Sequence, residues 1–209
     1  MNDFNKLSSD ILRKNYLNTC ISSIEEFPYC RILGEFSAKC NTITEINSVQ
    51  VKDKLTFTWC MLYGLLDNNL QSPLKKFTSL SFKSIEKQTK YAREVSKYTD
   101  IDFSIEVNKE DKKISSVSDM IFIHTDFNYQ FLEDILVENC DMATKYIIIY
   151  DNKFVDMIKK NVFSIGNSLN TMKIQETITK FLIENNTWGL IKGYDTEYGM
   201  TILQRVKEV

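Results

Sequence analysis

Short runs rich in β-branched and aromatic residues alternate with longer amphipathic stretches over most of this 209-residue chain. Such alternation is typical of successive βα units, which fold into a parallel sheet with helices on both faces. The last run, Tyr146–Tyr150, has no polar alternation, as expected for a central strand that helices cover on both sides. The predicted strands are Thr42–Ile46, Lys76–Leu80, Ile101–Ile105, Met120–Ile123 and Tyr146–Tyr150.

The spacing of apolar residues predicts helices before and between these strands. The first forty residues have a helical pattern, with a break at Pro28 before a second helical stretch at Ile32–Lys39. The helices expected between the strands are Leu55–Leu66, Ser84–Tyr98 and Tyr129–Leu136.

The end of the chain has a different pattern. A helix carrying Ile174, Ile178 and Phe181 is followed by two strand-like segments, Trp188–Tyr194 and Thr201–Val206, with only a few residues between them. This spacing indicates an antiparallel hairpin. We therefore expect an α/β fold of the Rossmann-like type: a mostly parallel sheet, a C-terminal hairpin and helices on both faces. The 209 residues form a single domain in this interpretation, with a helical part at 1–40 and a core at 41–209.

Glycine is too scarce for several common kinds of active site. The chain has six glycines, and none lies between Gly34 and Gly64 or between Gly64 and Gly166. A Walker loop, a G-x-S-x-G nucleophile elbow and an intact glycine-rich dinucleotide turn all need closely spaced glycines. These classes of site are excluded.

Cysteine and histidine are also too few and too scattered for a structural zinc site. The five cysteines form no C-x-x-C pair, and His124 is the only histidine, so we expect no metal. An odd cysteine count without a cleavable leader favours a reducing, cytoplasmic setting in which the cysteines pack in the core. The bias of 22 Lys over 4 Arg is expected of A- and T-rich coding DNA, and indicates a viral, phage or AT-rich bacterial source.

Charge and hydropathy limit the partners. A formal net charge of −2 leaves no basic surplus for a phosphate backbone, so no nucleic acid is expected. The longest apolar run, Trp59–Leu66, is far shorter than the roughly 20 residues that span a bilayer, so no membrane partner is expected. A protein partner or a second copy of the chain is compatible with this composition.

Five segments resemble motifs of class I S-adenosylmethionine-dependent methyltransferases, particularly small-molecule O-methyltransferases of bacteria, phages and giant viruses. The family's E-hydrophobic-G strand end and S-T-W helix start are similar to Thr42–Asn47 and Phe57–Trp59. Its F-I-D-T-x-H-T-Y-x-x-L and Y-I-I-x-H-D-T motifs are similar to Phe122–Leu132 and Tyr146–Asn152. Its closing W…Y…N-G-L-T-x-L pattern is similar to Trp188–Leu203. The resemblance implies the Rossmann-like methyltransferase fold.

The resemblance also implies which residues would bind S-adenosylmethionine. Glu45 ends the first strand, and Asn47 and Ser48 occupy the following turn, where the family has glycine. Ser81 follows the second strand, where the family has a carboxylate for the ribose hydroxyls. A side chain in place of glycine takes space or adds strain, and a hydroxyl makes a weaker hydrogen bond than a carboxylate.

On the substrate side, the family's Asp and His are replaced by His124 and Phe127. The polar groups left at the strand ends are His124, Asp126 and Asp151, which are the candidates for deprotonating an acceptor hydroxyl. Each also has a structural interpretation: His124 as an ordinary polar residue satisfied by a neighbour, and the two aspartates as helix caps.

Two functions fit these residues. The first, which the departures from the motifs favour, is a methyltransferase-like protein with a degraded donor site that acts in binding, assembly or structure. The second is an active S-adenosylmethionine-dependent O-methyltransferase acting on a small molecule or a sugar hydroxyl. Nucleotide or sugar binding without methyl transfer is a third hypothesis.

Overall fold

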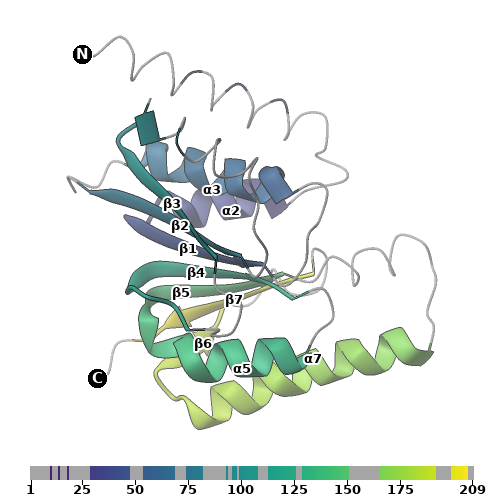
Figure 1. Ribbon diagram of the computed structural model, residues 1–209. Coiled ribbons are helices and arrows are strands. Elements are labelled where there is room, and N and C mark those ends of the chain that lie inside the picture. Colours follow the sequence, from purple (N-terminus) through teal and green to yellow (C-terminus); the bar gives the residue numbers. More distant parts are fainter. Residues whose placement is uncertain are drawn as a thin grey trace. The chain divides into compact units, whose positions relative to one another are not determined.

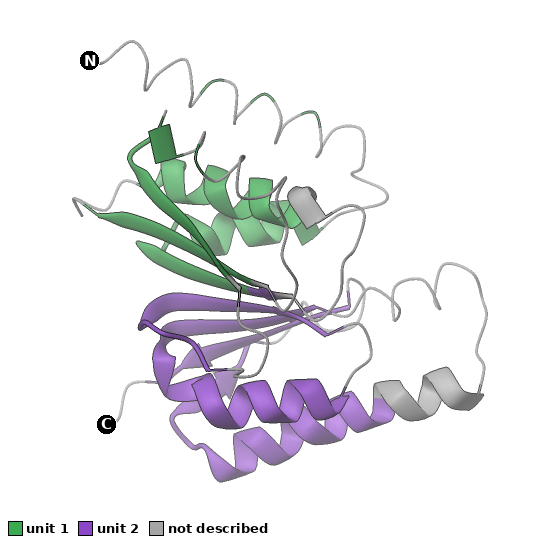
Figure 2. Ribbon diagram, viewed as in Figure 1, with its two compact units in different colours: residues 1–45, 50–109 green, residues 46–49, 110–209 purple. Residues whose placement is uncertain are grey.

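A computed structural model describes the chain over residues 29–47, 54–68, 74–81, 99–107, 113–125, 129–150, 165–191 and 199–206, with residues 10, 14, 18, 93, 96 and 97 singly. Its helices and strands follow the predicted alternation (Figure 1). The chain divides into two compact units, residues 1–45 with 50–109 and residues 46–49 with 110–209 (Figure 2). The single domain expected from the sequence stays a prediction.

All five predicted parallel strands are present, and each observed strand contains its predicted run. The strand order is β3-β2-β1-β4-β5-β7-β6. β2 pairs parallel with β3, and β4 pairs parallel with β5, whereas β7 is antiparallel to both β5 and β6. This order and these directions confirm the predicted Rossmann-like methyltransferase topology. The strands are β1 (Thr42–Asn47), β2 (Lys75–Ser81), β3 (Ile101–Val107), β4 (Ser118–His124), β5 (Ala143–Tyr150), β6 (Trp188–Leu190) and β7 (Met200–Arg205).

Two helices of the first unit pack closely against each other. They are α2 (Tyr29–Ser37) and α3 (Lys54–Asp67). α2 begins directly after Pro28, earlier than the predicted start at Ile32, because Tyr29 is buried and its ring stacks on Phe57 with 4.8 Å between centroids. The helix predicted at Ser84–Tyr98 lies largely outside the described residues, as do most of residues 1–28.

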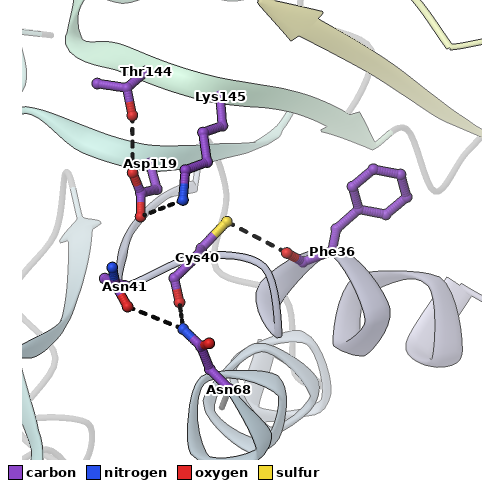
Figure 3. A network of polar contacts seen from close by, with 7 residues as sticks. All are labelled: Phe36, Cys40, Asn41, Asn68, Asp119, Thr144 and Lys145. Carbon is purple, nitrogen blue, oxygen red and sulfur yellow. Dashed lines mark hydrogen bonds and ion pairs between the residues drawn. The ribbon is translucent and has the colours of Figure 1, made fainter. Parts of the chain in front are cut away.

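A buried amide ties the end of α3 to the start of β1. The Asn68 amide nitrogen donates hydrogen bonds to the Cys40 carbonyl at 2.5 Å and to Asn41 Oδ1 at 3.0 Å (Figure 3). The Asn41 carbonyl in turn accepts from the Lys76 backbone nitrogen at 2.9 Å, which joins this corner to β2. The first unit therefore fixes where β1 starts.

The second unit carries α5 (Tyr129–Asn139), the short 3-10 helix η1 (Cys140–Met142) and α7 (Ile165–Glu184). α5 and α7 lie side by side (Figure 1), and Lys180 of α7 forms a 2.9 Å ion pair with Glu133 of α5. At the end of α5, buried Asn139 accepts from the Ile114 backbone nitrogen at 2.6 Å and donates to the Ile135 carbonyl at 3.0 Å. Asn139 thus attaches α5 to the segment that leads into β4.

The predicted C-terminal hairpin is confirmed, although its first strand is shorter than the sequence indicated. Trp188 pairs with Arg205, and the Arg205 guanidinium lies 4.9 Å from the Trp188 ring centroid. Arg205 also donates to the Ala143 and Cys140 carbonyls at 3.1 Å each. Gly199, just before β7, has φ 62°, a conformation that glycine adopts without steric cost.

The described cysteines match the predicted packing role. Cys30, Cys40 and Cys60 are buried thiols, and Cys140 is half-buried. In the described part of the chain, no helix combines the length and the apolar character needed to cross a bilayer.

Candidate functional site

Glu45 lies near the carboxyl end of β1, and its side chain points into the first unit. It is 2% exposed. The Ser79 hydroxyl on β2 donates to Glu45 Oε2 at 3.0 Å, and the Thr58 hydroxyl on α3 lies 3.2 Å from each carboxylate oxygen. Both hydroxyl residues are 5% exposed. The carboxylate is therefore held by the protein's own donors, in a place that water scarcely reaches.

This cluster joins three elements. β1 supplies the acceptor, while α3 and β2 supply one hydroxyl donor each. A buried carboxylate needs such donors because taking its charge out of water without hydrogen bonds is costly. Hydrogen bonds to an ionised group are also stronger than those between neutral groups. The arrangement stabilises the fold of the first unit by joining its sheet to α3.

The sequence predicts a site role for Glu45 and none for Thr58 or Ser79. The available signal was polarity at positions where a buried element should be apolar. Thr58 directly follows the buried Phe57, and Ser79 lies between Thr78 and Leu80, all in elements of the core. A hydroxyl in such a place is normally satisfied by a nearby polar group.

Asn47 and Ser81 each lie one residue further into a strand than the sequence indicated. Asn47 is the last residue of β1 rather than part of the turn after it, and Ser81 is the last residue of β2 rather than the residue after it; only their backbone is described. Ser48 lies outside the described residues. Their predicted roles stay predictions.

His124 is the last residue of β4, in the second unit. It is fully buried, and its ring centroid lies 5.4 Å from that of Tyr150, its register partner on β5. The next residue, Thr125, continues the pairing through a 3.1 Å hydrogen bond from its backbone nitrogen to the Tyr150 carbonyl. The buried Thr125 hydroxyl has no hydrogen-bond partner among the described residues. Asp126 and Asp151 lie outside the described residues.

Metal ligands do not gather within the described ranges. No group of three or more His, Cys, Asp or Glu that could hold a metal ion is found there. The expectation of no metal stays a prediction for the whole chain.

Solved structures share this fold. The cofactor-bound structure of Rv0187 from MTB matches with a TM-score of 0.53 and 11% identity, covering 94% of this chain and 90% of that one. A putative caffeoyl-CoA O-methyltransferase from Staphylococcus aureus matches with a TM-score of 0.53 and 16% identity, covering 94% and 91%. The chain has the Rossmann-like methyltransferase fold.

A third solved structure has the same fold. The plantazolicin methyltransferase BamL, in complex with a triazolic desmethylPZN analog and SAH, matches with a TM-score of 0.50 and 11% identity, covering 95% of this chain and 91% of that one. No protein-family model and no curated protein matches the sequence. The methyltransferase-like fold is thus supported by structure.

Proposed function

We propose that this protein is a methyltransferase-like binding or assembly component whose donor site no longer holds S-adenosylmethionine. The observation that carries the proposal is the Glu45 carboxylate, buried to 2% exposure and bonded to Ser79 and Thr58 at 3.0–3.2 Å. A methyl donor that needed this acid would have to reach a carboxylate that is 2% exposed and already accepts from two hydroxyls, so it would displace one of them or enter a place closed to water. Breaking such buried bonds without replacement costs about 1.5–3 kcal/mol each.

Sequence departures at three other points support the same proposal. Asn47 stands where the family has glycine, Ser81 stands where the family has the ribose-binding carboxylate, and His124 replaces an aspartate on the substrate side. Each change removes either space or a charged acceptor. The residues present therefore fit S-adenosylmethionine poorly, and we derive no methyl-transfer step through it.

The proposal includes a cytoplasmic setting and a viral or phage source. Cysteine usage and the excess of Lys over Arg support these two parts. Its partner is a protein or a second copy of the chain.

Thermal unfolding of the whole protein with SAH tests the proposal. A protein that binds SAH with a Kd of about 1 µM gains about 4.1 kcal/mol in roughly 1 mM SAH, which raises Tm by roughly 8–16 °C. We expect no change in Tm. A rise of that size would overturn the proposal.

Two parallel measurements separate the other hypotheses. Transfer of a tritiated methyl group from S-adenosylmethionine to alcohol or sugar acceptors would show an active O-methyltransferase. A rise in Tm with adenosine or a sugar nucleotide, but not with SAH, would show nucleotide or sugar binding without methyl transfer. We expect neither result.

A further inference from the structure

The solvent-facing side of α7 carries two large apolar side chains. Met172 is 57% exposed and Ile183 is 79% exposed. The opposite side of the helix packs into the second unit through Ile174, Ile178 and Phe181, each 5% exposed. Three helical turns separate Met172 from Ile183, so both project from the same side. The helix therefore presents apolar groups on two faces, one packed into the second unit and one exposed.

Polar residues complete the exposed face between these two apolar ends. We call this face the outer stripe of α7; all its members are exposed. A hollow of about 510 Å³ runs along it, with Glu184 also in its lining. The outer stripe consists of Met172, Gln175, Glu176, Thr179, Lys180 and Ile183.

The order of residues along the outer stripe is self-complementary when one copy is reversed. A two-fold axis midway between Glu176 and Thr179 sets Met172 against Ile183 of the second copy. The same axis brings Lys180 beside Glu176 of the second copy. Apolar groups then meet apolar groups, and acid meets base, as an isologous interface requires.

Charges along the outer stripe favour one orientation. The same axis sets exposed Lys173 opposite position 182 of the second copy, between Lys180 and Glu184, so Lys173 adds no preference of its own. A parallel arrangement would set like charges against each other at Glu176 and Lys180, whereas the antiparallel axis sets Lys180 beside Glu176. Charge complementarity therefore selects a second copy in the antiparallel orientation.

Existing contacts leave Lys180 able to take part. Lys180 bonds Glu133 at 2.9 Å but is 59% exposed, and an ammonium group has three donors. The hydrogen bond and charge of Glu133, with the charge of Glu184, raise the pKa of Lys180, so it stays charged near neutral pH.

We infer that the outer stripe of α7 is the interface through which two copies of this chain form an antiparallel homodimer. One helical stripe of three turns buries less than the roughly 1,200–2,000 Å² of a standard interface. The dimer is therefore weak, with a Kd on the order of micromolar or higher.

Sedimentation velocity of the full chain over a concentration series tests the dimer. We expect a reversible monomer–dimer equilibrium in the wild type. The double variant M172E/I183E sets two acids against each other and should raise the Kd at least about tenfold. V137E is the matched control because Val137 is 70% exposed on α5 and lies outside the outer stripe; it should dimerise like the wild type. A wild type that stays monomeric at all concentrations would overturn the inference, as would M172E/I183E dimerising unchanged.

Crosslinking tests the antiparallel register independently. Equal amounts of M172C and I183C chains, mixed and treated with a short bismaleimide, should give a crosslinked dimer. Either variant alone places its two new thiols about 16 Å apart and should react no more than the wild type, whose native cysteines provide the background. Crosslinking of the single variants equal to that of the mixture would contradict this register.

A charge exchange provides the last test. E176K and K180E each set like charges together and should weaken the dimer, whereas E176K/K180E restores opposite charges and should recover the wild-type Kd. Far-UV circular dichroism confirms that each variant is folded. A double variant as weak as the two single variants would overturn the charge pairing on which the inference depends.

Discussion

The hydroxyl of Ser79 on β2 donates a 3.0 Å hydrogen bond to the carboxylate of Glu45 on β1. In a Rossmann-like fold, ligands bind at the carboxyl ends of the strands. Here the acid at the end of β1 is instead engaged by a neighbouring strand and by Thr58 of α3. The Glu45 carboxylate therefore helps to hold β1, β2 and α3 together.

Removing the Ser79 hydroxyl should destabilise the protein. S79A leaves the buried Glu45 carboxylate with one donor fewer, so we expect a loss of about 1.5–3 kcal/mol in the free energy of unfolding. Urea denaturation followed by circular dichroism measures it. S104A is the matched control, because Ser104 pairs with Thr78 at 3.3 Å in a part-buried place and should cost about 0.5–1.5 kcal/mol. Equal losses of unfolding free energy in the two variants would show that the Ser79–Glu45 hydrogen bond stabilises the protein no more than the Ser104–Thr78 bond does.

Substitution of Gly64 should also be costly, although alanine favours helices. A Cβ at Gly64 would press on the Gly34 carbonyl oxygen, and would lie 2.5 Å from Ser37 Cβ and 3.0 Å from the Ala38 nitrogen. Overpacking against backbone costs about 1–3 kcal/mol, which exceeds the roughly 1 kcal/mol gained in helix propensity. We expect G64A to lower Tm.

The control for G64A is G189A. At Gly189 the new methyl group would meet the Val206 side chain at 3.0 Å, and a side chain yields more easily than backbone. A stabilised G64A variant would mean that α2 and α3 separate without penalty.

Asn139 should be important for the second unit. N139A leaves the Ile114 backbone nitrogen without its side-chain acceptor, whereas the Ile135 carbonyl keeps the backbone hydrogen bond that it accepts within α5. One unsatisfied buried group costs about 1–3 kcal/mol, which is the expected loss. Amide hydrogen exchange should show faster exchange at Ile114 than in the wild type. Unchanged exchange there would contradict the bridging role of Asn139.

The Cys140 thiol should react slowly with iodoacetamide at pH 8. Burial, and then the charge of Asp141, raise its pKa above the ordinary cysteine value, so less thiolate is present. D141N removes the nearby negative charge and should speed alkylation at Cys140, measured by mass spectrometry of the modified peptide. Because burial is the larger cause, the rate should still be below that of the unfolded chain. A slower reaction in D141N would show that the charge of Asp141 is not what retards Cys140.

Much of the fold could be predicted because its signals are local. The run Tyr146–Tyr150 has the apolar pattern of a buried parallel strand, and it forms the end of β5 between β4 and β7. The early start of α2 was missed because Tyr29 is held by the Phe57 ring, a partner distant in the sequence. The spacing of apolar residues within one segment does not reveal contacts with residues that are distant in the sequence.

The site could be predicted less completely, for the same reason. Glu45 could be identified from its place at a strand end, but its donors come from α3 and β2 and follow no fixed spacing. Likewise, the position of His124 indicated a strand end, while its complete burial depends on the elements that cover it. Thr58 and Ser79 become visible as a group only when the chain is folded.

Isothermal titration of the whole protein with S-adenosylmethionine tests most directly whether the donor site has been lost. We expect no saturable heat at S-adenosylmethionine concentrations up to roughly 1 mM. A Kd of 1 mM corresponds to a binding free energy of only about 4.1 kcal/mol, so the expected affinity is weaker than that. Saturable binding with a micromolar Kd would contradict the proposal and restore the enzyme as the better interpretation of this fold.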